Sequence, residues 1–301
     1  MKSSVTSATN LPKINRRRRL VKWETVIDHS VLILGSALML FPVLLTIMTS
    51  SYDKLAFAKN GLQFGWSDKF IENYNKALFE PSGFSGTIDG MTMLSNSLIL
   101  GLGFAVGKIV ISMMAAYAIV YFRFRFATFS FWIIFTTLLL PLEVRILPSY
   151  EVIQSFGLTN TYTGLIVPLI ASATGTFFFR QFFRSVPEEL VEAARIDGAG
   201  PVKFFIDILV PLSKTMIAAM FIIMFVFGWN QYLWPTLITT EEGMFTLVRG
   251  IKNIIQSFTD SNAIPEYGVG MALTIITMLP PVLIVVFFQS WFVKGLTESD
   301  K

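Results

Sequence analysis

The chain alternates between six strongly apolar segments and shorter polar stretches. At 1.5 Å per residue, helices of these lengths approach or exceed the roughly 30 Å thickness of a bilayer's hydrocarbon core. The pattern therefore predicts an all-α membrane protein with six transmembrane helices. The predicted spans are residues 31–48, 93–122, 126–142, 161–179, 212–233 and 270–292.

Composition strengthens this prediction and restricts the chemistry. Hydrophobic residues make up 53% of the chain and charged residues only 15%, whereas a soluble domain carries about 25% charged residues. The sequence has no cysteine, and His29 is its only histidine. Disulfides, zinc–thiolate sites, iron–sulfur clusters and Ser-His-Asp catalysis therefore lack their side chains. We expect a non-catalytic protein without a metal site or a cofactor of its own.

The distribution of positive charge predicts the orientation. Residues 1–26 form a basic tail with four consecutive arginines at 16–19. Such a run can bind nucleic acid, but directly before an apolar segment it indicates topology. Of the 24 lysines and arginines, 16 lie on the side that holds both termini and 7 on the other. We therefore predict a cytoplasmic tail, a six-helix domain over 27–301, both termini in the cytoplasm and no nucleic-acid partner.

The longest charged interruption between two spans is residues 185–211. Ser185 and Glu188 have the spacing of a capping box, which predicts a helix start. Gly198 is a typical helix stop, and Pro201 is suited to the first position of a second helix. The pattern predicts a cytoplasmic helix–turn–helix that a second protein grips. A plain connecting loop is the alternative.

Lys108 is the only full charge deep in an apolar span. Its neighbourhood does not fit a phosphate-binding loop, because Gly103 and Gly107 have the wrong spacing and Ile109 replaces the required Ser or Thr. The two glycines instead indicate close helix packing. A lysine inside a membrane marks a transport pathway or an ion pair. It therefore meets an anionic substrate, or it pairs with a carboxylate of a partner or with Glu143.

Two further groups of residues are candidates for the substrate pathway. Glu143 and Arg145 lie between Pro141 and Pro148, where broken backbone can line a cavity, although a surface ion pair is equally compatible. At the end of the fifth span, the aromatic residues serve as interfacial anchors or line the pathway, with the adjacent amides favouring the second role. This second group is Trp229, Asn230, Gln231, Tyr232 and Trp234.

In the external loop 234–268, residues 246–255 have the pattern of a short amphipathic helix. Leu247 and Ile251 lie on its apolar side, with Lys252 beside them. The helix either contacts a soluble partner or lies on the membrane. We predict partner contact through these three residues.

The cytoplasmic element resembles a known motif. Residues 192–194 (Glu-Ala-Ala), three residues, Gly198, nine residues, Ile208 and then Pro211 resemble the EAA loop of ABC importer permeases, with Val210 where the pattern prefers Leu. The stretches FGWNQYLWP and FVKGL resemble the carbohydrate, or maltose-permease-like, group. GKIVISMMAAYAIVYFRF, LPLEVRILP and ASATGTFFFRQFF resemble the second permease subunit of sn-glycerol-3-phosphate importers. The N-terminal tail and the first external loop lie outside the likeness.

The resemblance implies the type I ABC importer permease fold in a bacterial inner membrane. It also implies a related permease subunit, two copies of a cytoplasmic ATPase that uses ATP and Mg, a periplasmic or surface binding protein, and surrounding lipid. The residues that would couple this chain to the ATPase are Glu188, Glu192, Ala193, Ala194, Arg195, Asp197, Gly198 and Pro211.

Other transport classes fit less well. A permease for a neutral sugar or oligosaccharide is the alternative within importers. A secondary transporter would need coupling carboxylates in its spans, and none occurs in the first, second, fourth, fifth or sixth predicted span. An intramembrane enzyme would need catalytic groups that the spans lack.

Overall fold

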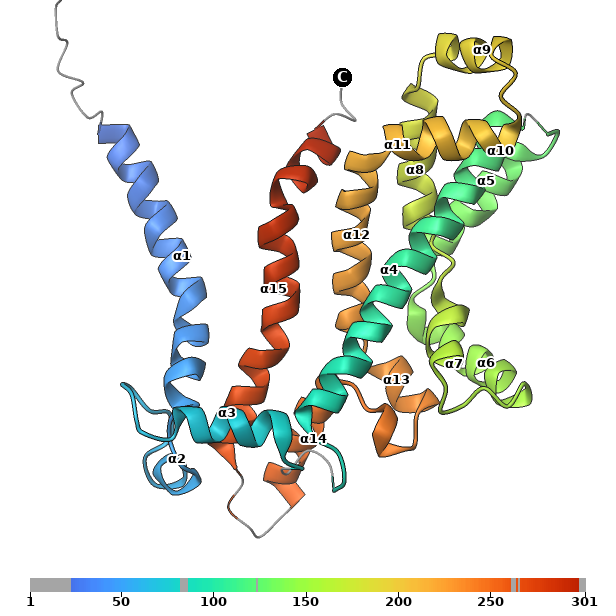
Figure 1. The fold of residues 1–301 in the computed structure, drawn as a ribbon. Coiled ribbons are helices and arrows are strands. Elements are labelled where there is room, and N and C mark those ends of the chain that lie inside the picture. The colour runs from blue at the N-terminus through green and yellow to red at the C-terminus, as the bar shows by residue number, and fades with distance from the viewer. Residues whose placement is uncertain (1–22, 82–85, 123, 261–263, 265, 298–301) are drawn as a thin grey trace, which may run out of the picture. The chain divides into compact units, whose positions relative to one another are not determined.

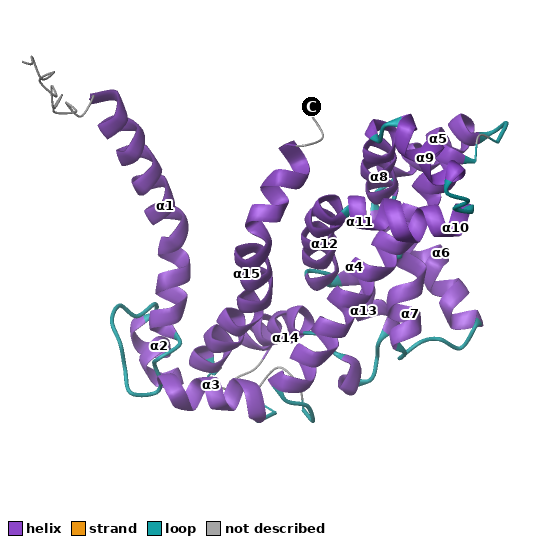
Figure 2. Ribbon diagram, turned by 45° about the horizontal axis from the view of Figure 1, so that its top comes forward, coloured by secondary structure: helices purple, strands orange, loops and turns teal. Residues whose placement is uncertain are grey.

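A computed structural model describes residues 23–81, 86–122, 124–260, 264 and 266–297, which form helices and loops without a strand (Figures 1 and 2). The four-arginine run and most of the basic tail lie outside this range. The chain divides into two compact units, Met1–Leu44 and Leu45–Lys301, and each is described by itself.

The described part of the first unit is most of helix α1 (Trp23–Thr49). The apolar side chains between Val31 and Leu44 are largely exposed. A helix that is apolar on all sides is stable only in lipid or within a larger assembly, so α1 has the surface of a membrane span. Pro42 lies inside it without ending it, as membrane helices tolerate.

The core of the second unit is built on α4 (Gly90–Tyr121), which packs along α8 (Ala173–Ser185) and α12 (Lys214–Trp229). Helix α12 also packs against α15 (Tyr267–Thr297). Small residues of α4 also allow a close approach of the chain that precedes α8: a Cβ on Gly103 or Gly107 would lie 2.5 Å from the Ile166 side chain or 2.6 Å from the Ile170 side chain, respectively. The prediction that these two glycines serve packing is confirmed.

Three helices are long and apolar enough to cross a membrane without a break, and up to six spans result if each of three bent helix pairs counts as one. The continuous spans are Thr25–Thr49, Gly90–Tyr121 and Tyr267–Trp291. The bent pairs are Ala127–Leu139 with Glu143–Ser155 (106°), Tyr162–Leu169 with Ala173–Ser185 (51°) and Pro201–Leu212 with Lys214–Trp229 (76°).

Two segments differ from their predictions. The fourth span was expected to be continuous over 161–179, but α7 (Tyr162–Ile166) and the 3-10 turn η2 (Val167–Leu169) end before α8 begins. Pro168 favours the stop, and the Ser172 side chain caps the new helix by accepting a bond from Gly175 N (3.2 Å). The predicted short link 143–160 is largely a helix, α6 (Leu142–Ser155), which follows α5 (Ala127–Thr136) and η1 (Thr137–Leu139).

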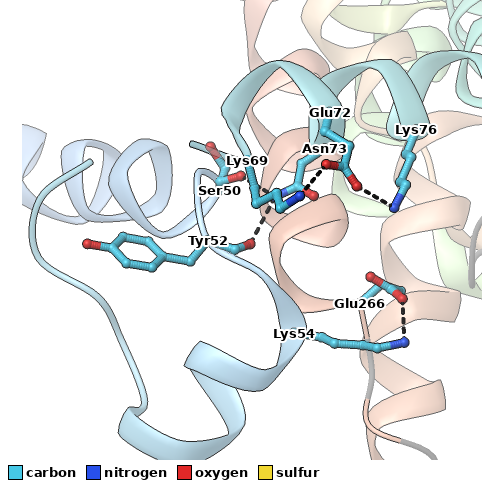
Figure 3. Close-up of polar contacts among 8 residues, drawn as sticks. All are labelled: Ser50, Tyr52, Lys54, Lys69, Glu72, Asn73, Lys76 and Glu266. Carbon is cyan, nitrogen blue, oxygen red and sulfur yellow. Dashed lines mark hydrogen bonds and ion pairs between the residues drawn. The ribbon is translucent and has the colours of Figure 1, made fainter. Parts of the chain in front are cut away.

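Short helices cluster at the end of the second unit opposite α9 and α10 (Figure 1). They are α2 (Lys54–Asn60), α3 (Phe70–Phe79), α13 (Leu233–Ile238), η4 (Glu242–Met244) and α14 (Leu247–Asp260). Figure 3 shows how one buried side chain fixes α3 to the chain that follows α1. Asn73 donates to the carbonyls of Ser50 (2.8 Å) and Tyr52 (2.9 Å).

Ion pairs on the exposed side of the same cluster involve Glu72, which bonds to Lys69 (2.7 Å) and Lys76 (2.9 Å), while Lys54 pairs with Glu266 (2.9 Å; Figure 3). Hydrogen bonds from the two lysines lower the pKa of the Glu72 carboxyl to about 2. The carboxylate therefore stays ionised until the pH falls toward that value. Water screens such exposed pairs, so they orient α3 more than they stabilise it.

Candidate functional site

The cytoplasmic element forms the predicted helix–turn–helix. Helix α9 (Glu188–Ile196) is followed by a turn and by a second helical stretch made of α10 (Pro201–Lys203), the π-helix η3 (Phe204–Leu209) and α11 (Val210–Leu212). Figure 1 shows α9 at one end of the second unit, beyond α8. Pro201 opens the second helix, as predicted.

The turn after α9 is a Schellman motif centred on Gly198. Ala199 N donates to Ala194 O (2.8 Å), and Gly198 N donates to Arg195 O (3.1 Å). Gly198 has φ = +73°, a conformation that costs an ordinary L-residue about 1–2 kcal/mol. The prediction that this glycine ends the helix is confirmed, and its backbone explains why.

The predicted capping box is wrong. Ser185 is the last residue of α8, and its hydroxyl donates to Phe182 O (2.7 Å). Pro187 takes the N-cap position and offers no side-chain cap, so α9 begins at Glu188. Pro187 explains the difference, because a proline disfavours helical backbone at the residue before it. Val186 accordingly has an extended conformation (φ −70°, ψ 126°).

Most of the candidate coupling residues are exposed on the surface of this element. Ala194 is buried against this chain. Glu192 and Arg195 form no ion pair with each other. The exposed candidates are Glu188, Glu192, Ala193, Arg195, Asp197, Gly198 and Pro211. Ile196 is 85% exposed at the end of α9 and Val202 70% exposed in α10, so apolar surface remains uncovered beside the charged residues.

Two tyrosines of α4 form hydrogen bonds with the chain just before α9 and just after it. The Tyr117 hydroxyl donates to Pro201 O (2.8 Å), and the Tyr121 hydroxyl donates to Phe183 O (3.1 Å). Their rings line a cavity of about 190 Å³ beneath α9, together with Ala194 and Phe204. These bonds connect α4 to the chain on both sides of α9. Sequence reasoning missed these tyrosines, because their partners are backbone carbonyls distant in the chain.

A larger cavity of about 520 Å³ brings Lys108 and Arg145 together. Lys108 is only 5% exposed. Its Nζ lies 4.8 Å from the ring centroid of Phe227 and 5.5 Å from that of Phe104. Among the described residues, ion pairs form at Lys54, Lys69 and Lys76, and none includes Lys108 or Arg145. The pairing with Glu143 suggested from the sequence does not occur, because Glu143 is exposed at the start of α6 outside the cavity lining.

The break in the fourth span also lines this cavity. Ser172 and the first residues of α8, Ala173 and Thr174, line it, followed by Thr176. Ser112, one helical turn after Lys108, donates to Ser172 O (3.2 Å) and holds the break against α4. Sequence reasoning missed this polar wall, although the run of small and hydroxyl residues at 171–176 was a usable signal.

The residues at the end of α12 are placed differently from the predicted pathway. Trp229 is 1% exposed and donates to Thr277 O (3.1 Å), while Trp234 is fully buried and donates to Leu165 O (2.9 Å). Gln231 is also buried, and only Asn230 is exposed. None of the five lines the Lys108 cavity. The tryptophans instead tie α12 and α13 to neighbouring helices.

Helix α14 has its expected amphipathic form, but its apolar side packs inward. Leu247 is fully buried and its N–H donates to Ser97 Oγ (2.8 Å), so it is not part of the outer surface. Ile251 is partly buried. Arg249 lies over the Phe245 ring (3.5 Å), and burial lowers the pKa of its guanidinium. Lys252 is exposed, with its Nζ 5.5 Å from the Tyr232 ring centroid.

Relatives of this chain share nearly its whole length. All three described here are named sn-glycerol-3-phosphate transport system permease protein UgpE. Those of Brucella melitensis and Rhizobium meliloti are each 47% identical over 279 residues, which is 92% of this chain and 97% of the relative. That of Yersinia pestis is 46% identical over 273 residues, which is 91% of this chain and 96% of the relative.

A solved structure shares the fold. It belongs to a bacterial ABC transporter involved in the import of the acidic polysaccharide alginate. The TM-score is 0.76 at 20% sequence identity, covering 91% of this chain and 98% of that chain. At this identity the likeness concerns the fold alone, and it confirms the predicted all-α, type I ABC importer permease architecture.

Residues 108–298 match the family described as binding-protein-dependent transport system inner membrane component. That stretch contains both the helix–turn–helix and the Lys108 cavity. Permeases of this family are non-catalytic membrane subunits, and the ATPase and the substrate-binding protein are separate partners. The chain therefore belongs to the family of binding-protein-dependent inner membrane components, the permease subunits of ABC importers.

Proposed function

We propose that this chain is a permease subunit of an ATP-driven importer for sn-glycerol-3-phosphate or related glycerophosphodiesters. The observation that carries the proposal is the 46–47% identity, over more than nine-tenths of both chains, to relatives named for sn-glycerol-3-phosphate transport. The unpaired Lys108 and Arg145 support a negatively charged cargo over a neutral sugar, which would leave both charges without a partner.

In the proposed complex, this chain forms half of the translocation pathway and a related permease subunit forms the other half. Two copies of a cytoplasmic ATPase use ATP and Mg, and a periplasmic or surface binding protein delivers the cargo. The complex lies in the bacterial inner membrane among lipids. The basic tail 1–26 and the six-helix domain 27–301 are arranged with both termini in the cytoplasm, as the excess of positive charge on that side supports.

Helix α9 is the proposed docking point for the ATPase. An exposed short helix with uncovered apolar residues such as Ile196 suits a groove in a partner. The buried Ala194 and the bonds from Tyr117 and Tyr121 connect this helix to α4, which also carries Lys108. Closure of the ATPases on ATP would therefore move α4 and reorient the cavity. Glu188, Glu192 and Asp197 supply polar contacts around the groove.

The opposite end of the unit is the proposed surface for the binding protein. Lys252 of α14 remains exposed there, whereas Leu247 and Ile251 hold the helix in place. For the cargo pathway we retain Lys108 and Arg145 as cavity residues. Contact of Glu143, Asn230 and Tyr232 with cargo stays a prediction. Trp229, Gln231 and Trp234 are buried and do not line the Lys108 cavity, so we assign them to helix packing.

Co-purification tests the assembly. The tagged chain, expressed with its related permease and ATPase, is expected to retain an ATPase that carries Walker motifs and to hydrolyse ATP in response to the loaded binding protein. A chain that transports actively as a single subunit would contradict the proposal and support a secondary transporter. Uptake of a neutral disaccharide with no response to sn-glycerol-3-phosphate would support the alternative cargo.

Tyr117→Phe is expected to weaken coupling without preventing assembly. The change removes one hydrogen bond to Pro201, worth about 0.5–1.5 kcal/mol, and keeps the ring in the cavity below α9. We expect the number of cargo molecules taken up per ATP hydrolysed to fall by roughly two- to twelvefold, in line with that free energy. The measurement is paired uptake and phosphate release in proteoliposomes.

The matched control is Tyr150→Phe. Tyr150 is partly buried, and its hydroxyl makes no hydrogen bond with the part of the chain that the structure describes. An equal fall in coupling for both variants would mean that the Tyr117 bond does not transmit motion.

A further inference from the structure

The cavity at Lys108 contains more positive charge than the surrounding protein neutralises. Lys108 and Arg145 both line this cavity. Burying an unpaired cation in a low-dielectric region is costly. The aromatic rings of Phe104 and Phe227 offset only part of this cost. The pair of cations therefore favours a multiply charged anion in the cavity.

The start of α8, which also lines the cavity, favours an anion as well. Helix α8 has 13 residues, and its first two, Ala173 and Thr174, line the cavity. The N-terminus of a helix carries a partial positive charge and N–H groups without intrahelical partners. Among the neighbouring hydroxyls, that of Thr174 makes no hydrogen bond with the described residues and is available to a polyol. The Ser172 hydroxyl accepts from Gly175 N, and the Thr176 hydroxyl donates to Ser172 O. A broken membrane helix whose second half points its N-terminus at an anionic group of the cargo is a recurring form of transport site.

The position of the cavity also fits a transport site. Lys108 lies 18 residues after the first residue of α4, which corresponds to about 27 Å along the helix. It therefore lies between the α14 end of the unit and the α9 end, which Figure 1 shows at opposite extremes. Ser112 links α4 directly to the break before α8. The α8 N-terminus is therefore joined to α4, the helix that carries Lys108 and that α9 would move.

We infer that this cavity is a charge-selective subsite that binds the phosphate group of a phosphate monoester through Lys108, Arg145 and the N-terminus of α8, in preference to a phosphodiester. The inference rests on the proposed function and refines its cargo. A monoester carries about −1.5 to −2 charge at neutral pH, whereas a diester carries a single negative charge. The positive charges of Lys108 and Arg145 balance the charge of a monoester, whereas a bound diester would leave part of their charge without a counterion. The Thr174 hydroxyl receives the glycerol part.

The test compares two cargoes in the complete importer, reconstituted in proteoliposomes with its own binding protein. The cargoes are sn-glycerol-3-phosphate and its methyl phosphodiester, and the readout is the ratio of their uptake kcat/KM values. The same binding protein serves every variant, so its own selectivity cancels when variants are compared with wild type. We expect Lys108→Met and Arg145→Gln each to lower the ratio about tenfold, the effect of losing one charge-assisted hydrogen bond to the dianion.

Two further variants act as controls. Lys108→Arg restores the charge and is expected to keep the ratio near the wild-type value. Lys59→Gln removes one positive charge from the exposed end of α2, and it should leave the ratio unchanged. Arg145 is exposed at the start of α6, so Arg145→Gln preserves the fold and decides the question if Lys108→Met fails to assemble.

The outcomes separate the subsite from the overall function. Uptake of both cargoes with a ratio that Arg145→Gln and Lys108→Met leave unchanged overturns the subsite but not the importer. Loss of assembly in Lys108→Met, combined with an unchanged ratio in Arg145→Gln, assigns Lys108 to an ion pair with the partner permease and also overturns it. Failure of the wild-type complex to take up either cargo contradicts the proposed function itself.

Discussion

Importers carrying Gly198→Arg are expected to assemble in the membrane and to hydrolyse ATP, yet to lose at least about nine-tenths of their uptake per ATP, a loss equivalent to roughly 1.4 kcal/mol or more. Gly198 makes the αL turn of the Schellman motif after α9. A Cβ at this position meets nothing within 4 Å, so a side chain can leave the turn without an immediate clash. The arginine side chain projects from the surface proposed to enter the ATPase groove.

Two effects add at this position. The positive φ costs a non-glycine residue about 1–2 kcal/mol, which loosens the end of α9. The long charged side chain then keeps the partner's groove from closing around the exposed Ile196. Because neither effect reaches the buried core, insertion and expression should stay near the wild-type level while coupling falls.

Gly198→Asn is the matched variant, since asparagine tolerates the αL conformation and is small. We expect it to retain most of the coupling, with Gly198→Ala between the two because alanine introduces only the backbone cost. Uptake and phosphate release measured on the same proteoliposomes give the coupling ratio. Wild-type coupling in Gly198→Arg would refute α9 as the docking helix.

The second large effect is expected from Gly268→Ala, which should destabilise the folded chain. Gly268 lies in the first turn of α15, where an added Cβ would be 2.2 Å from Tyr52 O and 2.5 Å from Asn73 Nδ2. No rotamer change relieves a clash with a backbone carbonyl. The two bonds that Asn73 donates to Ser50 and Tyr52 (Figure 3) would have to break or lengthen.

Leaving this buried amide unsatisfied costs about 1–3 kcal/mol, and the displaced backbone adds to that cost. We expect the purified complex to melt at least about 5 °C lower, with reduced yield. Gly243→Ala is the control, because a Cβ at Gly243 meets nothing within 4 Å. A melting temperature equal to that of the control would show that the Asn73 junction does not hold the short helices together.

The sequence predicted the elements that depend on single residues or on short runs of residues. Apolar run length was sufficient for the continuous spans. Gly198 and Pro201 marked the turn of the coupling element, because positive φ and a missing N–H are properties of single residues. The EAA spacing then identified the family that the comparisons confirm.

Features that depend on distant partners could not be obtained in the same way. Interfacial and buried tryptophans have the same local pattern, and only the carbonyls of Thr277 and Leu165 place Trp229 and Trp234 inside the fold. The hydropathy pattern also predicted a continuous fourth span, because one serine at position 172 changes the mean hydropathy little. The Ser172 side chain nevertheless caps the start of a new helix. The cavity at Lys108 is consequently visible only in three dimensions.

The central claim is that this chain works as the coupled permease of an ATP-driven importer of a glycerol phosphate. Its most direct test is uptake of radiolabelled sn-glycerol-3-phosphate into proteoliposomes that contain this chain, its related permease and the ATPase, with the binding protein outside and ATP inside. We predict accumulation against a gradient that requires ATP and the binding protein together. Accumulation by this chain alone, or a complete complex that hydrolyses ATP without moving sn-glycerol-3-phosphate, would contradict the account.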